Sequence, residues 1–286
     1  MEEHFPETPD GVRLSLRRFP AEGTRKACCL CTHAMMSDSR YFSKKNGFAE
    51  YLSRAGVEVF LLDWRGHGKS VPPFPKDGDW TFESYVLQDL PTAMRAAAKI
   101  AQIEITELCY LGHSLGGLVG LAAFGTEVLP SPRKLSLWAT SLWLPGEKGP
   151  WKRRMMMAGY EATTRLLGFA PIRLFRMGSN DEPASYVRQL TSWAKDGDWK
   201  RPDGQSYLLS LSNIKSDTWA VTGLGDELSS PNDAATMQRR IPGARPIRRV
   251  GCALGDAIDA DHFTLFTARE LHPLWDEFIH FLVEDE

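Results

Sequence analysis

The chain has 286 residues, 43% of them hydrophobic, a formal net charge of −2 and five cysteines. This length favours one α/β domain with an insertion over two independent domains, and the charge balance excludes a global field that attracts nucleic acid. Residues 1–6 are acidic and lack the apolar run of a signal peptide, and no stretch reaches the ~20 apolar residues of a membrane span. Five cysteines are too few for a disulfide framework in a chain of this length. We therefore expect a cytoplasmic protein.

The first half of the chain alternates predicted strands with predicted helices. Residues 12–19 alternate apolar and charged side chains, which is typical of a half-exposed antiparallel strand near a sheet edge. Residues 27–32 and 57–62 are nearly continuous apolar runs and are expected to be buried inner strands. Helical patterns follow them at residues 48–55 and 82–101. This alternation predicts a mainly parallel sheet with helices on both faces.

Three cysteines fall inside the first of these inner strands. Cys28 and Cys31 form a C-x-x-C pair, a spacing that metal sites also use. The sequence has no second Cys or His pair at metal-ligand spacing after them. We therefore interpret these thiols as buried packing groups rather than as a metal or redox site.

A glycine-rich turn joins the next predicted strand, residues 108–111, to a helical pattern. Ser114 stands at this turn, with Gly112 two residues before it and Gly116 two residues after it, which is the pattern G-x-S-x-G. The turn needs small neighbours because the serine backbone is strained. The helix N-terminus that follows favours a developing negative charge. We interpret Ser114 as a nucleophile; the alternative is a structural turn whose serine has no catalytic role.

Regularity ends after a short predicted strand at residues 135–139. Residues 144–214 contain no buried-strand run and predict a helical cap inserted between two parts of the core, residues 1–143 and 215–286.

Helical spacing within this cap suggests an apolar face that covers an acyl-binding pocket. The spaced residues are Trp151, Met155, Ala158, Ala162, Leu166 and Phe169. Basic residues share the region, among them Lys152, Arg153, Arg154, Arg165, Arg173 and Arg176. One interpretation is that they contact an anionic membrane or an acidic head group, and the other is a solvated basic face.

The second part of the core supplies the groups that a serine nucleophile requires. Asp226 follows the predicted strand at residues 218–222, and Glu227 is its alternative. His262 lies between a predicted strand at residues 244–250 and a final predicted helix at residues 265–283. Because useful groups sit beyond the carboxyl ends of parallel strands, the histidine and the carboxylate are expected to meet the serine as base and orienting group.

Two motifs resemble those of a known family. The sequence G-H-S-L-G-G at residues 112–117 and D-W-R-G-H-G-K-S at residues 63–70 resemble α/β-hydrolase fold serine hydrolases of the monoacylglycerol lipase and lysophospholipase-like type, in the serine aminopeptidase-like family. The resemblance covers essentially the whole chain. It implies an oxyanion hole of the Met35 and Leu115 N–H groups, with Met36 as the alternative to Met35, although this chain has Ala34 where the family usually has glycine.

Together these features predict a serine hydrolase that cleaves a carboxylic ester with an apolar chain through an acyl-enzyme, without a metal or an organic cofactor. Thioesterase, lactonase or acyltransferase activity on the same triad, and a non-catalytic ligand-binding protein, are the alternatives. The expected partner is a small-molecule acyl substrate, not nucleic acid, with weak lipid-surface contact through the cap; the oligomeric state is left open. Substrate contacts are expected from Met36, His113, Trp143, Trp151 and Met155.

Overall fold

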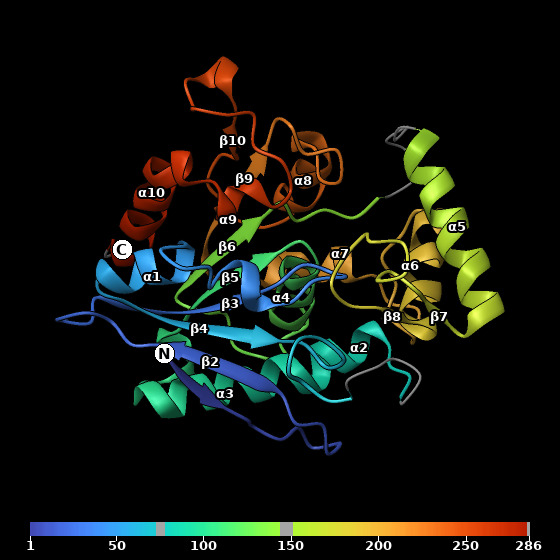
Figure 1. The fold of residues 1–286 in the computed structure, drawn as a ribbon, viewed down its shortest axis with the longest axis horizontal. Coiled ribbons are helices and arrows are strands. Elements are labelled where there is room, and N and C mark those ends of the chain that lie inside the picture. The colour runs from blue at the N-terminus through green and yellow to red at the C-terminus, as the bar shows by residue number, and fades with distance from the viewer. Residues whose placement is uncertain (73–77, 144–150, 285–286) are drawn as a thin grey trace.

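In the described part of the chain, eight strands form one sheet in the order β1-β2-β4-β3-β5-β6-β9-β10 (Figure 1). The coordinates are a computed structural model that describes residues 1–72, 78–143 and 151–284. The strands are β1 (Glu2–His4), β2 (Ser15–Phe19), β3 (Ala27–Thr32), β4 (Val57–Asp63), β5 (Cys109–His113), β6 (Lys134–Trp138), β9 (Asp217–Gly223) and β10 (Arg248–Val250).

The sheet is parallel from β4 to β10 and antiparallel at its other edge. β2 pairs antiparallel with β4, with Ser15 opposite Asp63, and β1 pairs antiparallel with β2. The predicted mainly parallel sheet is therefore confirmed, and so is the antiparallel strand near its edge. The outermost strand, β1, was not predicted because three residues are too short for an alternation to show.

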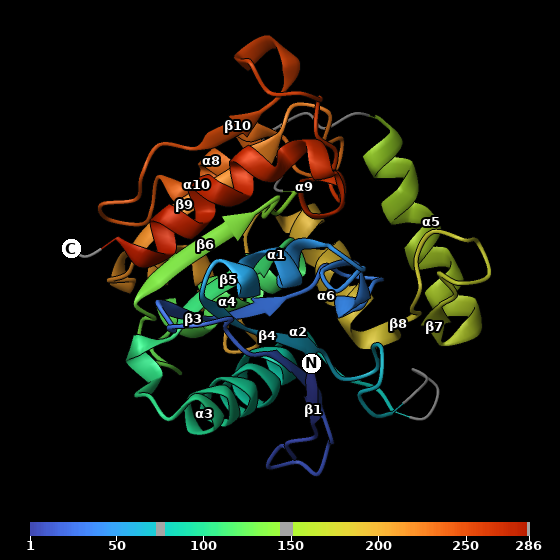
Figure 2. The same cartoon turned by 60° about the vertical axis from the view of Figure 1, so that its left-hand side comes forward.

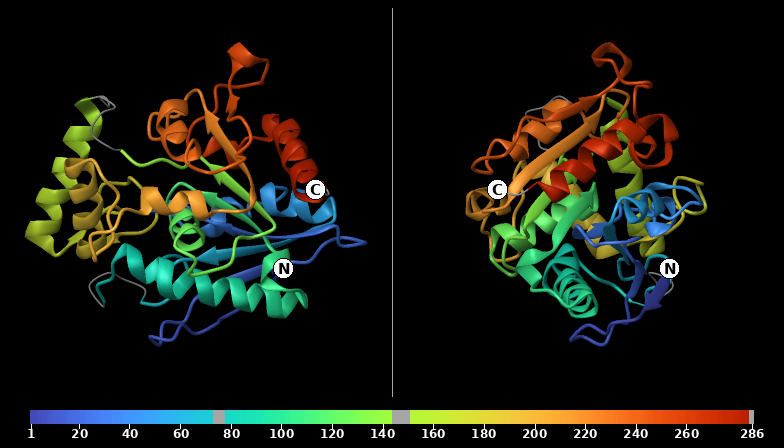
Figure 3. Two further views of the ribbon diagram at one scale, coloured as in Figure 1. Left: turned by 180° about the vertical axis from the view of Figure 1, so that it is seen from behind. Right: turned by 90° about the vertical axis from the view of Figure 1, so that its left-hand side faces the viewer.

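Helices cover both faces of this sheet. In β3, Leu30 packs in a buried cluster with α3 and α4, whereas the next residue, Cys31, packs in a second cluster with α1 and α10. This alternation follows from the two-residue period of a strand. Figure 2 and Figure 3 show α3 and α10 on opposite sides of the sheet. The described helices are α1 (Phe48–Arg54), α2 (Phe82–Ser84), α3 (Leu90–Ala101), α4 (Leu115–Gly125), α5 (Trp151–Leu167), α6 (Ala184–Asp196), α7 (Tyr207–Ser210), α8 (Pro231–Gln238), α9 (Thr264–Thr267) and α10 (His272–Val283).

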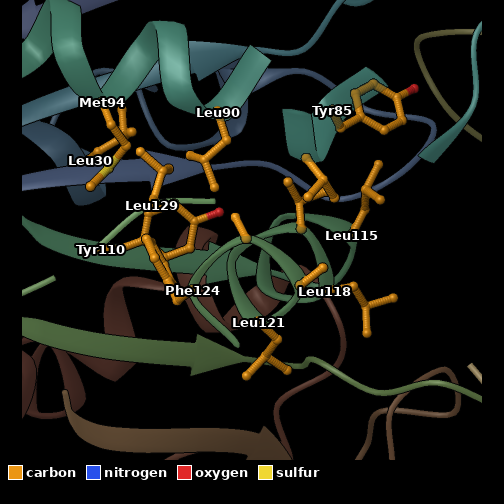
Figure 4. Packing of buried hydrophobic residues seen from close by; sticks show 14 of the residues in the cluster. Leu30, Tyr85, Leu90, Met94, Tyr110, Leu115, Leu118, Leu121, Phe124 and Leu129 are labelled. Atoms are coloured by element: carbon orange, nitrogen blue, oxygen red, sulfur yellow. The ribbon is translucent and has the colours of Figure 1, made fainter. Parts of the chain in front are cut away.

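The helix after Ser114, α4, is buried along its whole length. Figure 4 shows Phe124 of α4 next to Tyr110 of β5, and Leu115, Leu118 and Leu121 pointing away from the same helix into the surrounding core. A helix that is apolar on all sides belongs to a core rather than to a surface. The turn that precedes α4 is thus held by a fully packed element.

Most of the chain between the neighbouring strands β6 and β9 forms a separate layer, the cap, beyond the carboxyl ends of the parallel strands (Figure 1). The cap contains α5, α6 and a two-stranded antiparallel sheet of β7 (Phe169–Ala170) and β8 (Glu182–Pro183), whereas α7 packs against the core helix α4. α6 docks on the core through Trp193, whose ring centroid lies 5.2 Å from that of Phe82. The predicted start of the cap, at residue 144, lies outside the described residues. None of the helices in the described ranges has the length and apolar character that crossing a membrane requires.

Two predicted helices differ from the observed ones. A π-helical turn, Tyr85–Asp89, divides the helix that was predicted at residues 82–101. The last residue of this turn, Asp89, forms a buried ion pair with Arg65. The final helix predicted at residues 265–283 consists of α9 and α10. The break has a local cause, because Pro273 lacks an N–H and is accommodated only in the first turn of a new helix.

Candidate functional site

Ser114 occupies a strained turn between β5 and α4. Its φ is 54° and its ψ is −112°, a conformation that side chains rarely adopt. Its N–H donates to the carbonyl of Trp138 at 3.0 Å, which fixes the turn to the neighbouring strand. A Cβ at Gly112 would overlap the backbone of Gly117, and a Cβ at Gly116 would overlap Thr32. The glycines are therefore required because the strand, the turn and the helix approach one another closely.

Asp226 and His262 form a hydrogen-bonded pair. His262 Nδ1 lies 2.8 Å from Asp226 Oδ2, and both residues are buried. The other oxygen of Asp226 accepts the N–H groups of Leu228 and Ser229 at 2.8 and 2.9 Å. Because the carboxylate faces Nδ1, that nitrogen carries a proton and Nε2 is left as the basic nitrogen. The sequence alternative, Glu227, is exposed, whereas Asp226 is the carboxylate beside the histidine.

Ser114 and His262 lie on the wall of the same cavity, which has a volume of about 330 Å³. The wall is otherwise almost entirely apolar, and none of its described residues is Asp, Glu, Lys or Arg. A cavity of this size and polarity suits a small ligand with an apolar body. Its lining is Met35, Met36, Ser37, Ser114, Leu115, Leu118, Ser141, Leu142, Trp143, Met156, Met157, Tyr160, Met177, Gly178, Tyr186, Leu190, Ala194, Leu228, His262 and Phe263.

The loop at residues 33–38, after β3, and the first turn of α4 bring backbone amides to this cavity. The N–H of Ala34 donates to the Tyr41 hydroxyl at 3.2 Å, and that of Met36 donates to Glu182 Oε1 at 2.5 Å. Met35, between them, lines the cavity, and no hydrogen-bond acceptor for its N–H is found among the described residues. Leu115 is the first residue of α4, where an N–H has no partner within the helix.

Of the side chains expected to contact substrate, Met36 and Trp143 line the cavity. His113 does not, because it is completely buried behind Ser114, with Nδ1 2.7 Å from the Tyr41 hydroxyl. Burial lowers the pKa of His113, so that ring is neutral. The side chain of Trp151 lies outside the described residues.

The expected orientation of the cap helix is wrong. Met155 is 64% exposed and Leu166 is 84% exposed, so the stripe chosen from the sequence is the outer face of α5. The inner face carries Met156, Met157 and Tyr160, which line the cavity. Three consecutive methionines fit either face by spacing alone, and the observed inner face is the one on which Tyr160 and Thr164 are buried.

Two histidines beneath the loop at residues 33–38 have opposite charge states. His33 Nδ1 faces the Ala34 carbonyl and Nε2 accepts the Trp64 N–H, so the ring is neutral. Burial, as the larger cause, and repulsion from His67, as the smaller one, lower the pKa of His33 to about 4. Both nitrogens of His67 face acceptors, Arg65 O at 2.8 Å and Glu182 Oε1 at 3.1 Å, so this ring carries two protons. Burial lowers its pKa, but Glu182, the Arg65 carbonyl and Asp63 together more than offset that effect, and the pKa is raised overall. His67 lies in the motif at residues 63–70, but its contact with Glu182 could not be predicted because the two residues are far apart in the sequence.

No group of three or more His, Cys, Asp or Glu side chains within residues 1–72, 78–143 and 151–284 is placed to hold a metal ion. The arrangement of a strained serine, a carboxylate-bound imidazole and free amides around one cavity can instead support nucleophilic attack on a carbonyl carbon.

Comparison with known proteins agrees with this geometry. The model of the family described as serine aminopeptidase, S33, matches residues 23–187. A tear acid lipase-like protein of Mesocricetus auratus is 28% identical over 141 residues, which are 44% of this chain and 35% of that protein. The chain therefore matches only about a third of that relative's length.

Solved structures match over nearly the whole chain. An α/β hydrolase from Penicillium sp. sh18 has a TM-score of 0.66 at 15% identity, covering 98% of this chain and 97% of the other. A monoacylglycerol lipase from Paleococcus ferrophilus has a TM-score of 0.61 at 16% identity, covering 99% of both chains. At these identities the likeness concerns the fold.

Proposed function

The chain belongs to the serine aminopeptidase S33 family and has the α/β-hydrolase fold, and from this premise we propose that it hydrolyses carboxylic esters with Ser114 as nucleophile and His262 as general base. The observation that carries the proposal is the 2.8 Å contact of His262 with Asp226 at a cavity that the imidazole shares with Ser114. The family and the fold are those that the sequence predicted.

In the proposed reaction, His262 Nε2 takes the hydroxyl proton of Ser114 as Oγ attacks the ester carbonyl carbon. The negative charge that develops on the carbonyl oxygen is bound by the N–H groups of Met35 and Leu115. The tetrahedral intermediate expels the alcohol, which receives the proton from His262, and an acyl-enzyme remains. Water then gives a proton to the same nitrogen and attacks the acyl carbon. Collapse of this second tetrahedral intermediate breaks the bond to Ser114 Oγ, which takes the proton back from His262, and the acid is released. Asp226 holds the tautomer and stabilises the imidazolium.

The cavity favours an ester with an apolar acyl chain over a peptide with a free amino terminus. Met156, Met157 and Tyr160 supply adaptable or aromatic surface, and methionine adapts to flexible apolar ligands. A substrate ammonium group would enter a wall on which the described residues include no carboxylate. Leaving such a charge buried without a partner is unfavourable. Thioesterase, lactonase and acyltransferase reactions use the same groups and differ only in the leaving group or the acceptor.

The test is hydrolysis of p-nitrophenyl esters from acetate to dodecanoate, with labelling by a fluorophosphonate probe. We expect activity to peak above acetate, and labelling of the wild type but not of Ser114→Ala. Removal of a triad member should reduce kcat by about 10⁴-fold or more, so His262→Ala and Asp226→Asn serve as further variants. An unlabelled wild type would contradict the nucleophile, and full activity of His262→Ala would contradict the base.

We extend the proposal to weak contact with lipid surfaces through the outer face of the cap. Large apolar side chains are exposed there: Met155, Leu166, Leu167, Leu174 and Phe175. Arg165 is paired with Glu161, so apolar area rather than charge carries this extension. Wild-type protein should sediment with phosphatidylcholine vesicles more than the Leu166→Ser/Leu174→Ser variant. Equal sedimentation of the two would contradict it.

A further inference from the structure

Glu182 is buried at the junction of the cap and the core. It lies in β8 of the cap and is completely excluded from solvent, yet its carboxylate reaches two groups of the core. Oε1 accepts the N–H of Met36 at 2.5 Å and lies 3.1 Å from the charged His67. One oxygen therefore links the loop at residues 33–38 to the turn that follows β4.

The Met36 backbone is held from both sides by the same cap segment. Its carbonyl accepts the N–H groups of Ser179 at 2.9 Å and Asn180 at 3.1 Å, while its own N–H donates to Glu182. Met36 has a φ of 63°, a left-handed conformation that costs a non-glycine residue roughly 1–2 kcal/mol. Such a conformation persists only where surrounding contacts fix it. Cap residues 179–182 supply those contacts.

A second set of contacts fastens this cap segment to the core. The Asp38 carboxylate accepts the Ser179 hydroxyl at 2.8 Å and the Asn180 side-chain amide at 3.1 Å. Asn180 in turn accepts the N–H of Gly68 at 3.2 Å. The segment is thus hydrogen-bonded both to the loop at residues 33–38 and to the turn after β4.

The peptide plane that carries the Met35 N–H and the plane that carries the Met36 N–H meet at the Cα of Met35. Holding the Met36 N–H on Glu182 therefore limits how the Met35 N–H can turn. An oxyanion donor acts only when it points to the position of the developing charge. From these contacts, and on the basis of the proposed function, we propose that Glu182 is a positioning residue that fixes the Met35 amide of the oxyanion hole from the cap. It touches neither the substrate nor the reacting atoms.

The isosteric change Glu182→Gln tests the proposal because it replaces the charged acceptor of the Met36 N–H with a neutral amide oxygen, which forms a weaker hydrogen bond. If His67 loses its Nε2 proton, that nitrogen also competes for the amide NH2 while Met36 requires the amide oxygen. If His67 keeps both protons, it is a buried cation without a counter-ion. In each case Met36 loses its charged acceptor, so the hold on its N–H is weakened. Glu182→Asp keeps the charge but withdraws the oxygen by one methylene group.

The matched control is Glu161→Gln. Glu161 is also a cap carboxylate, on α5, and its partners are Lys195 and Arg165 rather than the loop at residues 33–38. The same chemical change therefore removes two cap ion pairs without touching the proposed link.

The measurements are kcat and KM for p-nitrophenyl butyrate, inhibition by an alkylboronic acid, and the unfolding midpoint. A boronic acid forms a tetrahedral adduct with the serine and reports on the oxyanion hole. We expect kcat of Glu182→Gln and Glu182→Asp to fall about 10- to 100-fold, less than the loss of a whole donor, with KM changed less than about threefold. Boronic acid affinity should fall in parallel with kcat, and Glu161→Gln should behave as wild type.

Folded variants at Glu182 that keep kcat within twofold of wild type would overturn the proposal. So would a fall in kcat without a change in boronic acid affinity, since the defect would then lie outside the oxyanion hole. If Glu182→Gln fails to fold, Glu182→Asp decides by the same criteria. A wild type that neither turns over esters nor reacts with the fluorophosphonate contradicts the proposed function itself, whereas an active wild type with unaffected variants contradicts only the role of Glu182.

Discussion

The turn at Ser114 and the loop at residues 33–38 face the same cavity but are held in different ways. The turn is fixed by the elements that flank it: β5, α4 and the adjacent β6. The loop is fixed by the cap, through a hydrogen bond between Met36 and Glu182, which are 146 residues apart in sequence. One half of the site is therefore a local structure of the core, and the other depends on a long-range contact.

This difference predicts different consequences of damage. Because the turn at Ser114 lies inside a packed core, disturbing it should unfold the protein. The loop at residues 33–38 lies between two layers, so disturbing its cap contacts should alter activity more than stability. Four predictions follow this contrast from the largest expected effect to the smallest.

Replacing Gly112 should have the largest effect. In Gly112→Ala the new methyl group overlaps the backbone of Gly117, which neither β5 nor the buried α4 can move to relieve. We expect a loss of about 3 kcal/mol or more in the free energy of unfolding, measured in urea. The control is Gly159→Ala on α5, where nothing lies within 4 Å of the new Cβ. There alanine should stabilise by about 0.5–1 kcal/mol, and equal effects at both sites would refute the contrast.

Removing the Tyr41 hydroxyl should cost about 1–3 kcal/mol. This hydroxyl accepts the N–H of Ala34 and donates to His113 Nδ1 at 2.7 Å, so Tyr41→Phe leaves two buried groups without a partner. The Tyr41 hydroxyl anchors the start of the loop at residues 33–38 to core residues alone, without a contact from the cap. Stability should therefore fall together with kcat, as followed by urea unfolding and ester hydrolysis. A variant of wild-type stability would show that the loop needs no anchor at this end.

Gly178→Ala should separate activity from stability. Its methyl group overlaps the carbonyl oxygen of Met36, but Gly178 is exposed and its segment can yield. We expect kcat for p-nitrophenyl butyrate to fall about tenfold, which corresponds to about 1.4 kcal/mol at the transition state. The unfolding free energy should change by less than about 1 kcal/mol. If stability falls and kcat does not, the cap segment serves only to hold the layers together.

The same contrast explains what could be predicted from the sequence. The turn that holds Ser114 could be predicted because G-x-S-x-G is a local requirement: a Cβ at either glycine would overlap a neighbour a few residues away or on the next strand. Asp226 and His262 were expected to meet because each follows a strand of the sheet, and they lie 2.8 Å apart. That they act together with Ser114 stays a prediction. Glu182 was not found, because an acidic residue beside Asp181 in an irregular segment has the pattern of an exposed loop. Its buried carboxylate lies 3.1 Å from His67 Nε2, and this contact spans 115 residues.

The orientation of α5 was missed for a related reason. Met155 and Met156 are chemically identical, and spacing alone assigns either of them to an apolar stripe. The choice is made by Tyr160, whose hydroxyl reaches the Met36 sulfur at 3.5 Å. Both the burial of Glu182 and the orientation of α5 involve contacts between the cap and the core, which the local sequence pattern does not reveal.

The smallest predicted effect is on the pH dependence of stability. The pKa of His67 is raised above its ordinary value of 6.5 because, although burial opposes the charge, the Glu182 carboxylate and the Arg65 carbonyl favour it. The folded protein therefore holds a proton that the unfolded chain releases. The resulting stability is fully present below about pH 6.5 and is lost as the pH rises through the folded pKa, by about 1.4 kcal/mol per unit of separation. Urea unfolding between pH 6 and pH 9 should show this alkaline loss in wild type and not in His67→Gln. Glu182→Gln should abolish it as well, because the charge on His67 depends on that carboxylate. Parallel pH profiles for all three proteins would mean that His67 is not the charged partner of the cap.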